Sequence, residues 1–347
     1  MAAETMDSAV LTSDIEYLAK LGLWDFFAGK TILITGATGM LGAYLALSAI
    51  EVNRTRGCAI RLLLLGRDRR KAASLFGERE CEMLIQDVRA PLATDQAVNC
   101  VFHAAGPVGP SVFGSDPEEV LSVNIEGTFS LLRYAIRHDC ECFALASTHE
   151  VYGAADGERD ETSPLFPLDS LEPRSCYVLA KQSAENALSC YHKKYGLRAL
   201  SARLSRLYGP LMNLESGLFV CDFMKDILSC QPVRVRGGMN LLRPLCYVAD
   251  AAAAMLFAAV FGKGGFAYNV QGRELPSIGE IAGNIARIGC RHAMFDHPET
   301  KNLPPHGHWL NTDRLKNLGW KQTVGLSEGM GKTLSFLMRE KKKEAAI

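Results

Sequence analysis

Short apolar runs alternate with longer amphipathic segments along the first 200 residues of the chain. The runs are rich in Ile, Leu and Val and are flanked by glycine or polar residues, which is typical of strands buried on both faces of a parallel sheet. We expect six such strands, at 31–34, 60–65, 82–86, 100–105, 143–146 and 197–204. Apolar residues at helical spacing between them predict long helices at 40–51, 117–138 and 176–195.

Strands that alternate with helices predict an α/β fold with a doubly wound parallel sheet, the Rossmann arrangement that binds dinucleotides. After Gly209-Pro210 the pattern loosens. We expect further helices at 219–228, 248–261 and 278–288, strands at 233–236 and 266–270, and a loop at 297–308.

This pattern divides the chain into four parts. Residues 1–28 form an N-terminal helical extension with a short helix at 18–27, and 29–208 form an NAD(P)-binding Rossmann domain. Residues 209–340 form a smaller C-terminal substrate-binding lobe, interleaved with the last elements of the sheet at about 243–270. The lysine-rich end, 341–347, is expected to be a solvated tail.

The balance of charge excludes several classes of partner. The chain has 38 basic and 38 acidic residues, so no overall positive field recruits nucleic acid or an anionic membrane. Acidic residues precede any apolar run in the first 28 positions, unlike a secretory signal, and the longest apolar run is too short to span a bilayer. The eleven cysteines include no CxxC pair, which argues against a zinc site or a disulfide framework. We expect a cytoplasmic protein without a metal.

A glycine-rich turn, Thr35-Gly36-Ala37-Thr38-Gly39-Met40-Leu41-Gly42, follows the first strand directly. In such a turn the first glycine permits the bend, the second lets the backbone approach a phosphate, and the third lets the helix pack on the strand. The helix then presents unpaired N–H groups to a pyrophosphate. We expect cofactor contacts from Gly36, Thr38, Gly39, Met40, Leu41 and Gly42; the alternative is a tight turn that holds no ligand.

The 2′ substituent of the cofactor's ribose is recognised near the end of the second strand. An acid there binds the 2′-hydroxyl and favours NAD, whereas an arginine accommodates the 2′-phosphate of NADP. Here Gly66 ends the strand and Arg67 follows, so NADP is slightly favoured. Asp68 could still reach the ribose if the loop bends. Asp87 and Val88, after the third strand, are expected at the adenine edge, unless Asp87 is a helix cap.

Four residues point to proton-transfer chemistry. Tyr177 and Lys181 lie one helical turn apart, and an ammonium near a phenol lowers the phenol pKa, which would make Tyr177 a general base. Thr148 could bind the same substrate hydroxyl. Glu150 could act as a second acid or base, or merely pair with an arginine or cap a turn, while His149 between them is expected to point away.

Arginines are frequent in the second half, and guanidinium groups bind phosphates in a bidentate manner. Among Arg203, Arg206, Arg234, Arg236 and Arg243, we expect Arg243 and then Arg236 to grip a nucleotide diphosphate, the alternative being salt bridges facing solvent. His292, His297, His306 and His308 lack the spacing of metal ligands and are expected to lie in surface loops.

The chain resembles the extended short-chain dehydrogenases/reductases of the NAD-dependent epimerase/dehydratase family, over about 30–336. Within that family it is most similar to the UDP-glucuronate decarboxylases and related nucleotide-sugar dehydratases. The segments that carry the likeness are His103-Ala104-Ala105-Gly106-Pro107, Ser147-Thr148-His149-Glu150-Val151-Tyr152-Gly153, Pro173-Arg174-Ser175-Cys176-Tyr177 and Arg243-Pro244-Leu245-Cys246-Tyr247-Val248-Ala249-Asp250.

The resemblance implies roles for these positions. Thr148, Tyr177 and Lys181 would act in a hydride step, Glu150 in a second step, and Arg243 on the diphosphate. Further cofactor contacts are implied for Ala104, Ala105, Gly106, Asn124, Tyr177 and Lys181, and substrate contacts for Pro107 and Arg206. The chain departs from the decarboxylase pattern where Gly66 replaces an acid, Arg206 an asparagine, Leu211 an arginine and Arg236 a tyrosine.

The resemblance therefore implies an NAD(P)-dependent enzyme, expected to be a homodimer, that acts on a nucleotide-diphosphate sugar. It would oxidise C4 transiently and then decarboxylate or dehydrate the sugar. Three alternatives stay open: a nucleotide-sugar 4-epimerase, an NADPH-dependent reductase, and a non-catalytic nucleotide-sensing protein.

Overall fold

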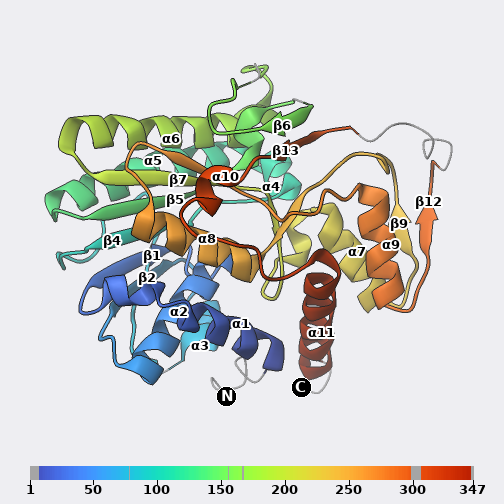
Figure 1. Cartoon of the computed structure of the whole chain (residues 1–347), viewed down its shortest axis with the longest axis horizontal. Coiled ribbons are helices and arrows are strands. Elements are labelled where there is room, and N and C mark those ends of the chain that lie inside the picture. The colour runs from blue at the N-terminus through green and yellow to red at the C-terminus, as the bar shows by residue number, and fades with distance from the viewer. Residues whose placement is uncertain (1–7, 78, 155, 166–167, 298–305, 345–347) are drawn as a thin grey trace.

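A seven-stranded parallel sheet forms the centre of the molecule (Figure 1). The computed structural model describes residues 8–77, 79–154, 156–165, 168–297 and 306–344. The strand order is β11-β7-β5-β4-β1-β2-β3. The chain starts at the inner strand β1, continues to the edge strand β3, and then crosses to β4 and the strands on the other side of β1. This path confirms the predicted doubly wound arrangement. The strands are β1 Thr31–Thr35, β2 Arg61–Gly66, β3 Glu82–Ile85, β4 Cys100–His103, β5 Cys142–Thr148, β7 Arg198–Leu204 and β11 Ala267–Val270.

Alternate residues of each strand enter different cores because successive side chains point to opposite faces of a sheet. Ile32 and Ile34 pack with helices α2 (Met40–Arg56) and α8 (Val248–Phe261). Leu33 packs on the other face with α5 (Pro117–Arg137) and α6 (Cys176–Tyr195). A short helix, α3 (Arg69–Phe76), joins β2 to β3. Helices on both faces explain why the strands read as continuous apolar runs.

The N-terminal segment differs from the single helix predicted at 18–27. Helix α1 spans Ala9–Lys20 and a separate 3₁₀ turn spans Leu23–Phe27. Gly22 lies between them with a φ of 74°, a left-handed conformation that interrupts an α-helix. Trp24 and Phe27 are nevertheless buried in the main core, so the apolar residues were read correctly and their geometry was not.

The second half of the chain adds pairs of short strands and several helices. Helices α7 (Phe219–Leu228) and α9 (Ile278–Ile288) lie beside β9 (Val233–Val235) and β12 (Ala293–Phe295), on the right of Figure 1. The other pairs are β8 (Arg206–Tyr208) with β10 (Leu245–Tyr247), and β6 (Gly157–Arg159) with β13 (His308–Leu310). The remaining helices are α4 (Pro110–Ser115), α10 (Asp313–Lys316) and α11 (Leu326–Glu344).

Two predictions for the second half need correction. The segment 341–344 is the end of α11 rather than a tail, and Lys341 Nζ donates to the Leu228 carbonyl at 2.6 Å. Lysine is a good helix former, so a run of charge alone does not indicate a break. The predicted loop at 297–308 ends in a strand, because His308 begins β13. Residues 298–305 of that loop lie outside the described residues.

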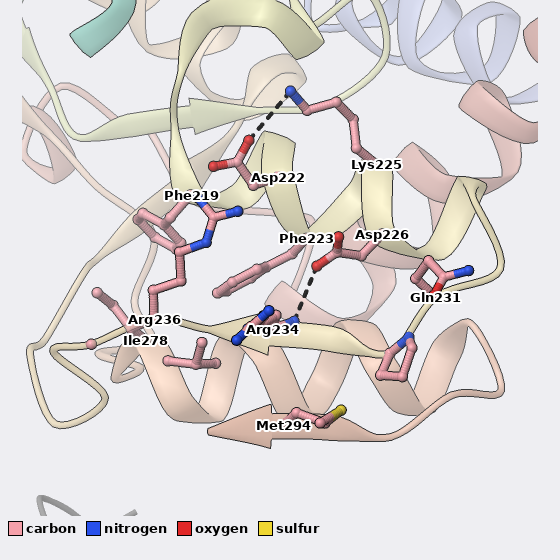
Figure 2. Close-up of a pocket in the computed structure, with 13 residues that line it drawn as sticks. Phe219, Asp222, Phe223, Lys225, Asp226, Gln231, Arg234, Arg236, Ile278 and Met294 are labelled. Atoms are coloured by element: carbon pink, nitrogen blue, oxygen red, sulfur yellow. Dashed lines mark hydrogen bonds and ion pairs between the residues drawn. The ribbon is translucent and has the colours of Figure 1, made fainter. Parts of the chain in front are cut away.

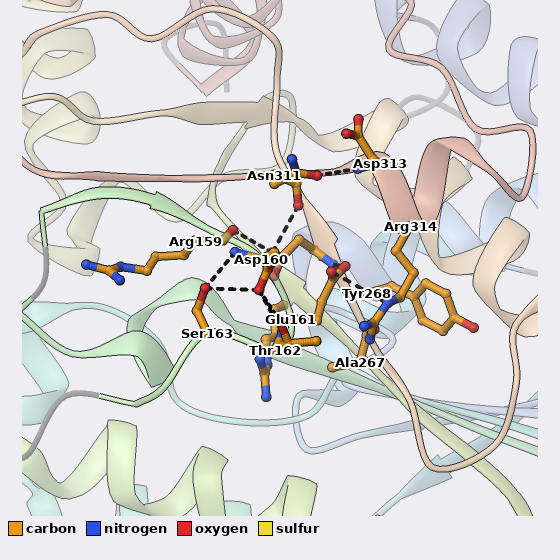
Figure 3. Close-up of polar contacts among 12 residues, drawn as sticks. Arg159, Asp160, Glu161, Thr162, Ser163, Ala267, Tyr268, Asn311, Asp313 and Arg314 are labelled. Atoms are coloured by element: carbon orange, nitrogen blue, oxygen red, sulfur yellow. Dashed lines mark hydrogen bonds and ion pairs between the residues drawn. The ribbon is translucent and has the colours of Figure 1, made fainter.

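A buried polar network holds the β6–β13 pair at the edge of the main sheet (Figure 3). The Asn269 amide group on β11 donates to the carbonyls of Arg159 and Asn311, at 3.0 Å each. The Asn269 backbone N–H donates to Glu161 Oε1 at 2.8 Å, and the buried Glu161 side chain lies 3.6 Å from Arg314. Because β11 ends at the carboxyl edge of the sheet, the network brings β13 close to the end of β5.

Within the described residues, no helix is long and apolar enough to cross a membrane. The same residues contain no group of three or more His, Cys, Asp or Glu side chains that could hold a metal ion.

Candidate active site

The glycine-rich turn lies against the end of β4. Gly36 has a φ of 64°, and a Cβ there would come within 2.5 Å of the Ala104 carbonyl oxygen. A Cβ at Gly42 would come within 2.3 Å of the Gly36 carbonyl oxygen. Helix α2 begins at Met40, and its N-cap is Gly39, which has no side chain to accept a hydrogen bond from the first N–H groups of the helix. The first N–H groups of this 17-residue helix therefore face the turn without a side-chain partner, as an anion-binding helix terminus requires.

A second set of small residues surrounds Asn124. A Cβ at Gly106 would lie 2.8 Å from Asn124 Oδ1, and one at Gly127 would lie 2.7 Å from Val88 Cγ1. Asn124 Nδ2 donates to the Val120 carbonyl at 2.8 Å, whereas the buried Oδ1 has no hydrogen-bond partner in the described part of the chain. Buried polar atoms are rarely left unpaired, so this acceptor and the close backbone approach fit a bound cofactor.

The ends of β2 and β3 carry a network of charges. Arg67 lies 2.5 Å from Glu119 and 3.8 Å from Asp87, while Arg89 forms ion pairs of 2.7 Å with Asp87 and 2.8 Å with Glu119. The Arg89 guanidinium holds the pKa of the Asp87 carboxyl below its usual value. Arg89 follows Asp87-Val88 directly in the sequence, but its role was missed because only the acid was considered.

The two acids at these strand ends, Asp68 and Asp87, make different backbone contacts. Asp68 caps helix α3, because its side chain accepts from the Lys71 backbone N–H at 2.9 Å. Its carboxylate is engaged there rather than free at the end of β2. Asp87 does not cap a helix; its Oδ1 accepts from the Arg89 backbone N–H at 2.8 Å.

Thr148 ends β5, and Tyr177 and Lys181 lie on the first turns of α6. All three side chains are buried. Lys181 Nζ lies 5.9 Å from the centroid of the Tyr177 ring and donates to the Ala146 carbonyl at 2.8 Å. Phe113 of α4 stacks on the Tyr177 ring with centroids 4.5 Å apart, a contact that the sequence did not indicate. These contacts restrict the orientation of the phenol and the ammonium.

The electrostatics of Tyr177 differ from the prediction. Burial raises the pKa of the phenol, and the nearby Glu150 carboxylate raises it further, while Thr148 and Arg206 act in the opposite direction. Burial also lowers the pKa of Lys181 to about 8. The prediction that the Tyr177 pKa lies below its usual value is therefore wrong, because desolvation outweighs the groups that lower it.

Glu150 belongs to a cluster of charged groups beside Tyr177. Its Oε1 lies 3.6 Å from Arg206 Nη2, which is the arginine pairing considered as an alternative. Arg206 Nη1 lies 3.1 Å from His149 Nε2, and His149 Nδ1 lies 3.0 Å from His308 Nε2. The prediction that His149 points away is wrong, and so is the placement of His308 in a surface loop. The sequence held no signal for this pairing, since 158 residues separate the two histidines.

The five arginines occupy different environments. Arg206 and Arg243 lie close enough to influence each other, and burial together with Arg206 lowers the pKa of Arg243 to about 10. Arg203 is structural: it pairs with Glu185 at 2.7 Å and donates to Tyr152 Oη at 2.9 Å. Arg203 therefore forms a salt bridge, which was the alternative to phosphate binding for these arginines, although the ion pair is buried rather than exposed to solvent.

Arg234 and Arg236 line a pocket of about 650 Å³ between α7 and β9 (Figure 2). Arg234 pairs with Asp296 at 2.9 Å, and Lys225 on the opposite wall pairs with Asp222 at 3.3 Å. No ion pair of Arg236 occurs within the described ranges, so it is the pocket cation available to an anion. Pro107, expected at the substrate, is half-buried directly after Gly106.

Known proteins were compared with this chain. Residues 32–270 match the model of the NAD dependent epimerase/dehydratase family. UDP-glucuronic acid decarboxylase 1 of Danio rerio is 27% identical over 317 residues, which cover 91% of this chain and 74% of that protein. UDP-glucuronic acid decarboxylase 6 of Arabidopsis thaliana is 28% identical over 306 residues, covering 88% of each.

Solved structures of similar fold include nucleotide-sugar enzymes. The UDP-glucose 4-epimerase of Thermotoga maritima, solved with UDP-glucose, has a TM-score of 0.76 at 20% identity and covers 89% of this chain and 99% of its own. The dTDP-glucose 4,6-dehydratase DesIV of Streptomyces venezuelae, solved as a double mutant with NAD bound, has a TM-score of 0.77 at 20% identity and covers 90% and 98%. The glycine turn, the Tyr177–Lys181 helix and the family match over most of the chain lead to one conclusion: this protein belongs to the NAD-dependent epimerase/dehydratase family.

Proposed function

We propose that this protein is an NAD(P)-dependent nucleotide-sugar decarboxylase that oxidises C4 of a sugar nucleotide and then releases its C6 carboxyl group. The observation that carries the proposal is the meeting of Thr148, Tyr177 and Lys181 with Glu150 and the half-buried arginines Arg206 and Arg243. The first three groups suit removal of a hydroxyl proton, and the arginines suit an anionic sugar. The similarity to UDP-glucuronic acid decarboxylases supports the same reaction.

Gly36, Gly39 and Asn124 would hold the cofactor, which when bound supplies a hydride acceptor for C4 and returns the hydride after the second step. Tyr177 Oη is the group to take the proton of the C4 hydroxyl. Thr148 Oγ1 would orient that hydroxyl, and Lys181, held by the Ala146 carbonyl, would stabilise the phenolate. Because burial raises the pKa of Tyr177, the phenolate requires this positive charge during turnover.

Oxidation at C4 makes the C6 carboxylate that of a β-keto acid. The C5–C6 bond then breaks, its electron pair passes to the C4 carbonyl, and carbon dioxide leaves. A proton must next be delivered to C5, and Glu150 is the carboxyl group beside Tyr177 that could relay it.

A preference for NADP over NAD is part of the proposal. Arg67 and Arg89 lie together at the end of the second and third strands, while Asp68 is engaged as a helix cap. A 2′-phosphate would gain charge-assisted hydrogen bonds from these guanidinium groups that a hydroxyl cannot match. The available cation Arg236 supports the pocket between α7 and β9 as the place for the nucleotide end of the substrate.

A homodimer is also part of the proposal, and light scattering of the purified protein would test it by measuring the molar mass in solution.

The deciding experiment is proton NMR of the product formed from UDP-glucuronate in heavy water, compared with UDP-glucose and dTDP-glucose. A decarboxylase yields a pentose nucleotide with one solvent deuteron at C5. For the Glu150→Gln variant we expect C4 oxidation without completion, so the 4-keto sugar accumulates. A matched control, Glu158→Gln on β6, should react as the wild type does.

Other products would identify the alternatives. Loss of water from a neutral hexose nucleotide would favour a dehydratase. A C4 epimer that keeps all its carbon and contains no deuterium would replace the lyase proposal with an epimerase, since removal and return of hydride needs only the Tyr177–Thr148 pair.

A further inference from the structure

Three side chains from distant parts of the sequence form a hydrogen-bonded row beside the catalytic residues. Arg206 begins β8, His149 follows β5, and His308 begins β13. The distances are 3.1 Å from Arg206 Nη1 to His149 Nε2 and 3.0 Å from His149 Nδ1 to His308 Nε2. Both are within the range of good hydrogen bonds. His149 is almost fully buried, so no water can readily replace either partner.

The chemistry of the groups determines where the protons lie in this row. A guanidinium group can only donate, so His149 Nε2 must accept and carries no proton. His149 is then neutral, with its proton on Nδ1, and donates to His308 Nε2. Burial and the charges of Arg206 and Arg243 keep the His149 pKa well below its usual value, in agreement with a neutral ring. The direction of both hydrogen bonds is therefore determined by Arg206.

The hydrogen bond to His149 uses Nη1 of Arg206 and leaves Nη2 and Nε for other partners. The contact from Nη2 to Glu150 Oε1 is 3.6 Å, longer than a hydrogen bond. Within the described residues, no hydrogen bond from Nη2 or Nε of Arg206 occurs. Arg206 is half-buried, and its unused donors lie beside Tyr177 and Glu150, where they are available to an acceptor that arrives with the substrate.

Positive charge is in excess around this position. The charge of Arg174 acts on Arg206, and that of Arg206 acts on Arg243, while Glu150 is the carboxylate that favours the charged form of both Arg206 and Arg243. Arg243 forms no ion pair among the described residues and donates from Nη1 to the Leu242 carbonyl at 3.0 Å. Burial lowers the pKa of Arg206 and of Arg243, which shows that both charges are held at a cost. One further negative group would relieve this imbalance.

We propose that Arg206 is the specificity-determining residue for a carboxylate on the sugar ring, and that His149 and His308 are positioning residues that hold its guanidinium for that contact. This inference rests on the proposed function in one respect, that the sugar binds beside Tyr177. Arg206 itself differs from the decarboxylase pattern, which has an asparagine at this position. An amide could bind the same group without charge, whereas Arg206 would add a charge-assisted hydrogen bond.

The substrate diphosphate is a second anion that Arg206 could bind. Two observations favour the sugar carboxylate. Arg206 and Glu150 both act on the Tyr177 phenol, so they lie at the place where the sugar reacts. The pocket with the available cation Arg236 instead lies between α7 and β9.

The test measures binding rather than turnover. Holoenzyme is titrated by calorimetry with two pairs of ligands, UDP-glucuronate against UDP-glucose and the corresponding dTDP sugars, which differ within each pair only by the carboxylate. For wild type we expect tighter binding of the carboxylate member of a pair. For Arg206→Gln, whose amide can still donate to His149, we expect that preference to fall by about 10- to 100-fold while neutral ligands bind almost as before.

Two variants at His308 separate positioning from packing. His308→Gln supplies an amide oxygen that can accept from His149 Nδ1, and the preference should stay within about 2-fold of wild type. His308→Leu cannot accept, and the preference should fall by about 3- to 10-fold. Arg61→Gln, an exposed arginine at the opposite end of the sheet, is the matched control.

Each outcome decides the inference. Equal binding of the two members of every pair by wild type, or an Arg206→Gln variant that weakens both members equally, overturns it. If His308→Leu and His308→Gln behave alike, the histidines have no positioning role. Carboxylate selectivity through Arg206 without release of carbon dioxide would refute the decarboxylase proposal and leave this inference intact, so the two can fail separately.

Discussion

Lys181 is expected to reduce the stability of the folded protein, and its replacement by methionine should increase that stability at neutral pH. The ammonium is almost fully buried, and burial lowers its pKa from 10.5 to about 8. At pH 7 the folded protein still holds the proton, but does so less readily than the unfolded chain. A difference of about 2.5 pKa units at about 1.36 kcal/mol per unit corresponds to roughly 3 kcal/mol of lost stability.

The hydrogen bond from Lys181 to the Ala146 carbonyl offsets part of this loss, by about 1 kcal/mol. Methionine fills a similar volume without a charge. We therefore expect Lys181→Met to raise the free energy of unfolding by about 1–3 kcal/mol at pH 7 while abolishing turnover. Stability given up for a reactive group is common at functional sites.

The dependence on pH gives this prediction a definite sign. The folded pKa is lowered, so between pH 8 and pH 10.5 the unfolded chain binds more protons than the folded protein. This group therefore makes wild type more stable as pH rises through that window. The advantage of Lys181→Met should shrink over the same interval and be lost near pH 10.5.

Urea denaturation at pH 7 and at pH 10 measures both effects. Lys193→Met, an exposed position on the same helix, is the control and should change stability by less than about 0.5 kcal/mol. A Lys181→Met protein that is less stable than wild type at pH 7 would refute the reasoning, because the buried ammonium would then be stabilised by contacts stronger than its desolvation.

Two further predictions concern the cofactor and the base. Tyr177→Phe should leave cofactor binding nearly unchanged and lower turnover by ~10²–10⁴, as expected for a lost general base. The rate of cofactor reduction in a single turnover, followed by absorbance, measures this effect. Rates near those of wild type would remove Tyr177 from the mechanism. Calorimetry should show tighter binding of NADP(H) than NAD(H), with the difference reduced in Arg67→Ala; tighter NAD binding that the substitution does not alter would contradict the role of Arg67.

The sequence was sufficient for features that depend on local pattern. Apolar runs separated by amphipathic segments predicted the strands of the main sheet and the long helices between them, because most of these strands are buried on both faces and need no distant information to be recognised. The glycine turn was equally visible, since its backbone excludes side chains at Gly36 and Gly42 whatever surrounds it. The N-terminal helix was misread because Gly22 interrupts a segment whose composition favours continuity.

Tertiary structure decided the electrostatics and the long-range partners. The pKa of Tyr177 depends on its depth in the protein and on Glu150, which spacing along a helix does not reveal. The pairing of Asn269 with Arg159 and Asn311 brings β13 to the active site and with it His308. Sequence alone therefore determined the fold class and the glycine turn, and it supplied the candidates for catalysis, because those follow from neighbours in the chain. Only the folded chain determined which charges meet and how deeply they are buried, because these depend on contacts between residues on different elements, such as Glu150 with Arg206 and His149 with His308.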